Sequence, residues 1–142
     1  MKLIIFILTV CFFTSLNAQS IIGEWETYDD ESGKKTSVVE IYKENNKYFG
    51  KIVNLYEDPK DPKDSVCEEC KGENRDKPVI GLIIIENLKK EEDEFNSGTI
   101  LDPKNGKTYK CQIELIENNK LKLRGYIGIS LFGRTQYWIR KT

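Results

Sequence analysis

Short runs of alternating apolar and polar residues, or of β-branched residues, recur through the chain after its first eighteen residues. No stretch in this part keeps its apolar positions at the three-to-four-residue spacing of an amphipathic helix. Alternation bounded by turn-forming residues is typical of strands. We therefore expect eight strands, over residues 21–28, 36–43, 47–55, 79–87, 94–101, 107–116, 120–127 and 134–140.

Several of the segments between the predicted strands are rich in asparagine and glycine, which tolerate the positive φ of hairpin turns. These segments are residues 31–34, 44–47, 103–106 and 117–120. Eight strands joined mostly by hairpins form a meander, and closure into a barrel removes its exposed edges. The pattern predicts an all-β fold, a single up-and-down antiparallel barrel of about eight strands over residues 19–142.

Two predicted strands alternate clearly enough to assign their faces. Cys111 and Ile113 alternate with charged or amide residues in the first, and Leu121 and Leu123 alternate with basic residues in the second. Because successive side chains of a strand point to opposite faces, we expect these four to point into the barrel, together with Tyr109, Leu115 and Gly125. A thiol in that position behaves as a small apolar group rather than as a nucleophile.

The longest connection covers residues 56–78, in which 13 of 23 residues are charged and three are proline. A loop of this length in a compact domain is usually functional, disordered or covalently tied. Cys67 and Cys70 lie within it as a C-x-x-C pair, which we interpret as a structural disulfide. A redox role is disfavoured because Glu68 and Glu69 between the sulfurs raise the thiol pKa. A metal site with a third ligand stays open as an alternative.

The first eighteen residues have the order of a secretory signal, with a lone Lys2, an apolar run from Leu3 to Phe13 and small residues up to Ala18. The apolar run is about half of the roughly 20 residues that span a bilayer. We expect cleavage near Ala18 and export to the periplasm or the medium. The mature domain then keeps three cysteines, and an oxidising compartment favours the disulfide and leaves Cys111 unpaired.

Composition excludes several classes of function. The chain has 22 basic and 23 acidic residues, which argues against a nucleic-acid binder, and it has no histidine. Lack of histidine removes serine–histidine and cysteine–histidine hydrolysis and most catalytic zinc sites. We expect a non-enzymatic protein without a cofactor or a bound metal.

Segments spread over nearly the whole mature chain carry a family resemblance. They are residues 22–27, 37–42, 50–52, 67–72, 78–82, 98–109, 123–126 and 132–138. On these segments the chain resembles the bacterial family named domain of unknown function 2147. The resemblance implies a small exported barrel of the lipocalin-like, or calycin-like, kind with no established activity.

The Gly23-Glu24-Trp25 tripeptide and Arg140 are also similar to a lipocalin pattern, in which a tryptophan near the barrel floor packs against a late arginine. The similarity implies that Gly23, Trp25 and Arg140 close one end of the barrel. The alternative is an ordinary buried tryptophan beside a tight backbone contact.

The last predicted strand offers two faces, and alternation alone does not decide which points inward. Apolarity favours the face with Tyr137, whereas the Arg-x-Gln-x-Trp motif of the resembled family favours the face with Arg134, Gln136 and Trp138 as a partly polar lumen. We adopt the second. Arg134 is then expected to pair with an anionic group, Gln136 to orient it, and Trp138 with Trp25 to cover apolar surface. A packed core without a cavity is the alternative.

The segment of residues 126–132, which we call the apolar tip, is too apolar for a solvated hairpin turn. Its large side chains include Ile129, Leu131 and Phe132. We expect it to fold over a barrel end as a lid; the alternative is contact with a membrane or a partner.

Two function hypotheses follow from these features. The first is a monomeric exported protein that binds a small apolar or amphipathic molecule with an anionic group in its lumen. The second is an envelope protein without a small-molecule site, which uses the apolar tip and the basic C-terminal strands to contact a partner or an anionic membrane. Residues 118–142 contain six basic and no acidic residues, which would attract such anions unless neighbouring acidic side chains offset them.

Overall fold

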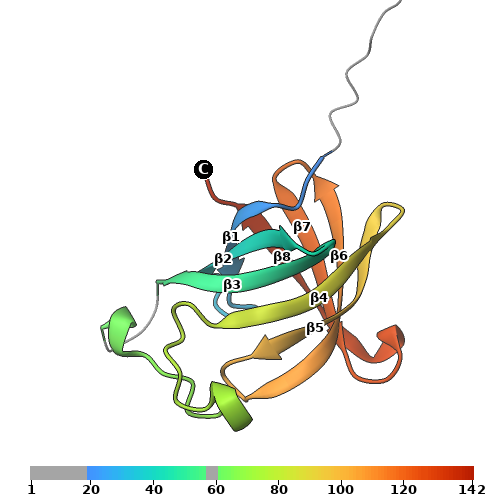
Figure 1. The fold of residues 1–142 in the computed structure, drawn as a ribbon. Coiled ribbons are helices and arrows are strands. Elements are labelled where there is room, and N and C mark those ends of the chain that lie inside the picture. The colour runs from blue at the N-terminus through green and yellow to red at the C-terminus, as the bar shows by residue number, and fades with distance from the viewer. Residues whose placement is uncertain (1–18, 57–60) are drawn as a thin grey trace, which may run out of the picture.

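The computed structural model describes residues 19–56 and 61–142, which fold into a closed barrel of eight antiparallel strands (Figure 1). Each strand pairs with the next in sequence, and the last returns to the first, so the predicted all-β up-and-down barrel is confirmed. The predicted signal peptide, residues 1–18, lies outside the described residues. The strands are β1 (Gly23–Tyr28), β2 (Lys35–Glu44), β3 (Lys47–Leu55), β4 (Ile83–Glu91), β5 (Glu94–Asp102), β6 (Lys107–Glu117), β7 (Lys120–Tyr126) and β8 (Gly133–Arg140).

The two ends of the barrel carry different connections (Figure 1). The β2–β3, β4–β5 and β6–β7 turns and the C-terminus lie at one end, which we call the closed end. The β1–β2, β5–β6 and β7–β8 connections lie at the open end with the long β3–β4 segment. Three short 3₁₀ helices also lie there: η1 (Pro62–Asp64), η2 (Gly72–Asn74) and η3 (Ser130–Phe132). Among the described residues, no helix has the length and apolar character to cross a bilayer.

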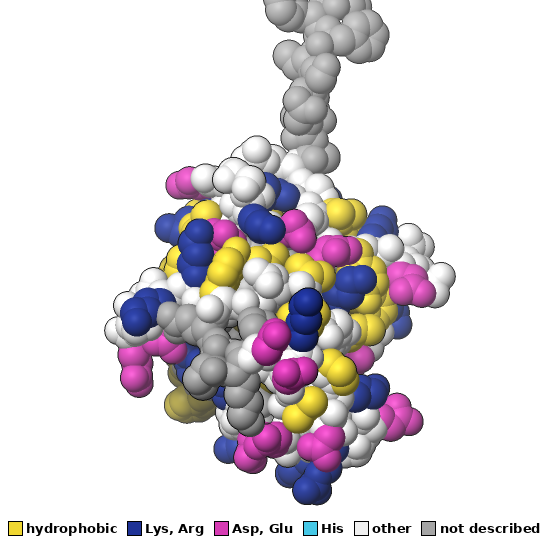
Figure 2. Space-filling model, turned by 90° about the vertical axis from the view of Figure 1, so that its left-hand side faces the viewer, with side chains coloured by type: hydrophobic (Ala, Val, Ile, Leu, Met, Phe, Trp, Pro, Cys, Tyr) yellow, Lys and Arg dark blue, Asp and Glu magenta, His cyan; other side chains and the backbone are white. Residues whose placement is uncertain are grey.

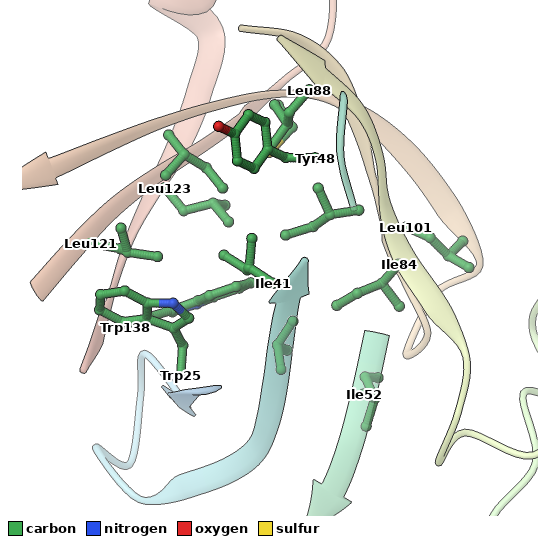
Figure 3. Close-up of a cluster of buried hydrophobic side chains, with 14 of the residues drawn as sticks. Trp25, Ile41, Tyr48, Ile52, Ile84, Leu88, Leu101, Leu121, Leu123 and Trp138 are labelled. Carbon is green, nitrogen blue, oxygen red and sulfur yellow. The ribbon is translucent and has the colours of Figure 1, made fainter. Parts of the chain in front are cut away.

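Alternation along the strands builds the core. Cys111, Ile113, Leu121 and Leu123 are all buried, so the predicted inward faces of β6 and β7 are confirmed. Side chains from several strands point toward one another inside the barrel (Figure 3). Burial raises the pKa of the unpaired Cys111 thiol to about 12, so this sulfur stays protonated and packs as an apolar group.

The fourth strand differs from its predicted range of residues 79–87 and runs instead from Ile83 to Glu91. Val79 and Leu82 belong to a turn, in which the Leu82 amide donates to the Val79 carbonyl and Gly81 has a φ of 95°. Leu82 is buried, and the turn exchanges two backbone hydrogen bonds with Ile52 of β3 through Gly81 and Leu82. The charged end of β4 pairs with the start of β5 as an exposed hairpin, where no apolar alternation marks a strand.

Three residues hold the closed end together. The Arg140 guanidinium lies 4.3 Å from the centroid of the Trp25 ring, and it donates to the carbonyl oxygens of Ser20, Ile22 and Asn118. A side chain at Gly23 would start 2.9 Å from Arg140 Nη1, at a φ of 135° that favours glycine. Gly23, Trp25 and Arg140 thus meet where β1 pairs with β8.

The outer surface mixes charges of both signs. Figure 2 shows lysine, arginine and acidic side chains interspersed with hydrophobic ones over the face that it presents. No broad patch of one sign covers this face, in keeping with the nearly balanced composition.

Candidate functional site

A cavity of about 500 Å³ opens at the open end of the barrel. Residues from β1, β2, β3, β4, β5, β6, β7 and β8 line it, together with residues of the β1–β2, β3–β4 and β5–β6 connections. Its volume falls in the range of ordinary small-molecule sites. The expected alternative of a fully packed interior is therefore not what the structure shows.

The deep wall of the cavity is apolar. It consists of side chains that sit on the inward-facing positions of their strands, namely Val39, Ile52, Ile84, Leu123 and Trp138. Trp138 is 2% exposed, whereas its neighbour Tyr137 is 48% exposed. The face of β8 that carries Arg134, Gln136 and Trp138 therefore points into the barrel, as the family motif implied.

A small group of hydroxyls interrupts the apolar wall where β1 meets β2. Thr27 Oγ1 lies 2.7 Å from Thr36 Oγ1 and 2.7 Å from Ser37 Oγ. All three residues line the cavity, and Thr27 is buried. Because the hydroxyls hydrogen-bond to one another, this part of the wall is polar but uncharged.

At the mouth, the Arg134 guanidinium is paired with a carboxylate of the same chain. Its Nε donates to Asp30 Oδ2 at 2.5 Å, and its Nη2 forms an ion pair with the same oxygen. Gln136 Nε2 donates to this oxygen at 3.4 Å, and Gln136 Oε1 accepts from Trp138 Nε1 at 3.3 Å. Arg134 was expected to pair with the anionic group of a ligand; in the structure it pairs with the carboxylate of Asp30, from the β1–β2 connection.

A second ion pair joins the β1–β2 connection to the opposite side of the mouth. Lys104 Nζ, on the β5–β6 turn, lies 3.6 Å from Asp29 Oδ2. Backbone and side-chain hydrogen bonds from Ser32, then the amide of Glu31 and the charge of Lys104, lower the pKa of Asp29. The β1–β2 connection is thus tied to β8 through Asp30 and to the β5–β6 turn through Asp29.

The β3–β4 segment forms one side of the mouth, and Cys67 and Cys70 are joined in it by the predicted disulfide. Val66 and Val79 from this segment line the cavity. The segment packs on the β5–β6 turn, because Cys67 Sγ lies 3.6 Å from the Pro103 carbonyl oxygen and a side chain at Gly106 would collide with the carbonyl of Glu69.

Sequence reasoning missed the contribution of this segment to the cavity. The Val79 amide donates to the Ser65 carbonyl, and Val66 forms an isolated bridge with Pro78. These contacts bring Val66, from the highly charged stretch, and Val79, which directly follows it, onto the mouth. The only signals available were that Val66 interrupts a run of polar residues and that Val79 begins an apolar one.

The expectation that the apolar tip covers the barrel as a lid is not met. None of residues 126–132 lines the cavity. Arg124, which points outward from β7, donates from Nε to the Ser130 carbonyl and from Nη2 to the Leu131 carbonyl. These bonds hold the tip on the outer side of the open end and leave Leu131 75% and Phe132 74% exposed.

Trp25 was expected to share the ligand-binding surface with Trp138, and this also needs correction. Trp25 is fully buried but does not belong to the cavity lining. Its Nε1 donates to the Ile21 carbonyl at 2.8 Å, and its ring contacts Arg140 at the closed end. The Trp25 ring forms part of the barrel floor, so it does not reach the cavity.

Comparisons with known proteins agree with this architecture. The family model described as "Uncharacterized protein conserved in bacteria (DUF2147)" matches residues 23–140. Among solved structures, the chain is similar to protein HP1028 from Helicobacter pylori, described as belonging to the lipocalin family, with 20% identity, a TM-score of 0.74, and 87% of this chain and 84% of that chain covered. At this identity the likeness shows the fold alone. Comparison with curated proteins gives no match.

Proposed function

Because the chain belongs to the bacterial DUF2147 family and folds as a lipocalin-like barrel, we propose that it binds a small amphipathic molecule in its cavity. The observation that carries this proposal is the cavity of about 500 Å³, whose deep wall is mostly apolar with one uncharged cluster of hydroxyls, and whose charged groups lie at the mouth. That combination is typical of small-molecule sites, in which apolar surface supplies affinity and a few polar groups fix orientation.

The distribution of groups along the cavity favours one orientation of the ligand. An apolar portion would lie against Ile52, Leu123 and Trp138, where burial of apolar surface is favourable. A polar or anionic group would lie at the solvent-exposed mouth near Gln136 and Arg134, the cation that pairs with Asp30 in the structure. The bound molecule would then keep its charged group hydrated.

A binding role rather than a catalytic one also fits the ionisable groups around the cavity. Asp29 and Asp30 are held in ion pairs with Lys104 and Arg134. Asp102 Oδ1 accepts a hydrogen bond from the Lys104 amide. These groups orient loops and have structural partners, whereas a general base needs a lone pair directed at a substrate proton.

We further propose that the protein is exported and acts as a monomer. The Cys67–Cys70 disulfide supports export, since such bonds persist in oxidising compartments. Closure of the barrel supports a monomer, because the sheet formed by the described residues leaves no edge open to pair with another copy.

Native mass spectrometry of the protein purified from its natural host tests ligand binding. We expect a fraction of the protein to carry an added mass of a few hundred daltons that organic extraction removes. Extraction should release an amphipathic compound. A single mass equal to that of the polypeptide, with no compound in the extract and no uptake of added amphipaths, would contradict the proposal.

A second candidate function rests on the apolar tip. Four of its side chains, Ile127, Ile129, Leu131 and Phe132, are between 59% and 75% exposed, and Lys110 and Arg124 contact its backbone. Exposed apolar groups flanked by cations are typical of peripheral contact with an anionic membrane. The tip would then serve to bring the protein to the envelope surface.

Sedimentation with phosphatidylglycerol-containing vesicles tests this second function. A Leu131→Asp, Phe132→Asp variant should lose salt-sensitive binding, because a charge replaces each inserted side chain. The control is Ile116→Asp, which changes a 44% exposed apolar residue on β6, away from the tip. Equal sedimentation of all three proteins, or no binding by the wild type, would contradict membrane contact through the tip.

A further inference from the structure

The Asp30 carboxylate occupies the donors that a ligand anion would use at the cavity mouth. We propose that Asp30 is an internal substitute for the anionic group of the ligand, and that the carboxylate of a bound amphipath displaces it from Arg134 and Gln136. This inference rests on the proposed binding function and adds to it the chemical class of the ligand, a carboxylate with an apolar body.

Three donors converge on a single carboxylate oxygen. Arg134 Nε and Nη2 both contact Asp30 Oδ2, and Gln136 Nε2 donates to the same atom at 3.4 Å. A fork of two guanidinium nitrogens matches the geometry of carboxylates and gives stronger hydrogen bonds than neutral donors do. The mouth is therefore already arranged around a carboxylate, which here comes from the protein itself.

The same donors connect to the apolar part of the cavity. Gln136 Oε1 accepts from Trp138 Nε1, which fixes the amide with its NH₂ group toward Asp30. Arg134, Gln136 and Trp138 follow one another along the inward face of β8 and all line the cavity. A ligand with its carboxylate on Arg134 would thus place its apolar body beside Trp138.

Asp30 can leave this position at small cost. The side chains of Asp30 and Arg134 are 40% and 67% exposed, and ion pairs in such positions contribute little to stability. The fold of the β1–β2 connection depends on Asp29 instead, whose Oδ1 accepts from the amides of Glu31 and Ser32 and whose backbone amide donates to the Lys34 carbonyl. Asp30 can therefore move away while the turn stays formed.

Calorimetric titration with decanoate and with decan-1-ol tests the substitution. We expect Asp30→Asn to raise the affinity for decanoate about two- to five-fold, because the competing charge is gone, and to leave the affinity for decan-1-ol unchanged. Arg134→Met should lower the affinity for decanoate at least about three-fold and spare decan-1-ol. Glu31→Gln removes one negative charge from the adjacent residue, which forms no ion pair among the described residues, and should behave as the wild type.

The outcomes separate this inference from the proposed function. If both probes bind and Asp30→Asn leaves decanoate affinity at the wild-type value, Asp30 does not compete and the inference is overturned while the binding function stands. An equal gain for both probes would make Asp30 a steric obstacle and would also overturn it. If neither probe binds any of these proteins, both the inference and the binding function fail.

Discussion

Among the described residues at the closed end, Arg140 makes more side-chain interactions than any of its neighbours. It stacks on Trp25 and donates to three backbone carbonyls, from the segment before β1 and from the β6–β7 turn. The β1–β8 seam beside it is short, with two paired positions. At the scale of single residues, Arg140 therefore adds side-chain contacts to a seam that few strand pairs hold.

Replacement of Arg140 by methionine should lower the free energy of unfolding by about 1–3 kcal/mol, because three carbonyls lose a charged donor and Trp25 loses its cation–π contact. Urea unfolding followed by tryptophan fluorescence measures the change. The matched control is Lys141→Ala, since Lys141 is the next residue and forms one ion pair at 3.9 Å with Glu24. Equal losses in the two variants would show that Arg140 has no special role.

Glu26 gives the chain a pH-dependent contribution to stability. Its carboxylate accepts a hydrogen bond from Lys35, opposed in part by burial, and further bonds from Tyr56 and Tyr28, and together these lower its pKa below 4.5. A lowered pKa in the folded state stabilises the protein above pH 4.5, and this contribution disappears as the pH falls through the lowered value.

Comparison of wild type with Glu26→Gln checks this contribution. The wild type should be more stable by about 1 kcal/mol at pH 7, and the difference should shrink below about pH 4.5 as Glu26 becomes protonated. Urea unfolding between pH 7 and pH 3 measures both proteins. A difference that stays constant over this range would rule out the ion pair and hydrogen bonds as its cause.

At the level of single residues, the sequence predicted which way side chains point better than it predicted which side chains pair with each other. Alternation predicted that Cys111 and Leu121 point inward, because the side-chain period of a strand is fixed by its backbone. It did not predict that Asp30 pairs with Arg134, since the two are separated by 104 positions and meet through closure of the barrel. Pairs across the mouth depend on loop conformations, which local pattern does not determine.

At the scale of elements, strands followed from the sequence and connections did not. Residues 47–55 and 94–101 match β3 and β5 to within one residue, because a predicted hairpin turn marks one end of each. The predicted range of β4 began and ended four residues too early, because the turn before the strand is apolar and the far end of the strand is charged. Residues 56–78 were expected only as a loop with a disulfide and residue 79 as the start of a strand, yet Val66 and Val79 both lie in the β3–β4 segment and line the cavity.

The Cys67–Cys70 disulfide should matter mainly for the β3–β4 segment. A Cys67→Ser, Cys70→Ser variant should lose about 2 kcal/mol of stability, the entropic value for so small a ring. In this variant the backbone amides of residue 67 and Val79, which donate to the carbonyls of Lys77 and Ser65, should exchange with solvent much faster than in the wild type. The amide of Ile113 in β6 should keep its protection.

Hydrogen exchange followed by mass spectrometry or NMR measures this effect. Cys111→Ala serves as the control, because it removes a buried sulfur from β6 and leaves the disulfide intact. Unchanged exchange in the β3–β4 segment of the double variant would mean that its backbone hydrogen bonds alone hold the mouth in place.

At the scale of the whole molecule, the barrel divides into a packed half and an open half. Large side chains such as Trp25, Leu88 and Tyr48 fill the interior toward the closed end. Toward the open end the cavity takes their place, bordered by a glycine, Gly125, on the inward face of β7. The family resemblance predicted such a barrel, but whether its interior was filled depended on side-chain packing that no pattern of alternation records.

The central claim is that the cavity binds the apolar body of a small molecule, and blocking it with one side chain tests this most directly. A Cβ at Gly125 would lie 3.7 Å from atoms of Ile100 and Tyr109, an ordinary contact, so Gly125→Leu adds its side chain inside the cavity without a clash at Cβ. Lys122→Leu places a leucine on the outward-facing side of β7, away from the cavity, and is the control.

Titration of decan-1-ol into the three folded proteins is the decisive measurement. We expect the wild type and Lys122→Leu to bind one molecule each with similar affinity, and Gly125→Leu to bind at least about ten-fold more weakly because its side chain occupies the ligand's space. Equal affinity of Gly125→Leu and the wild type, or no binding by the wild type, would contradict the claim.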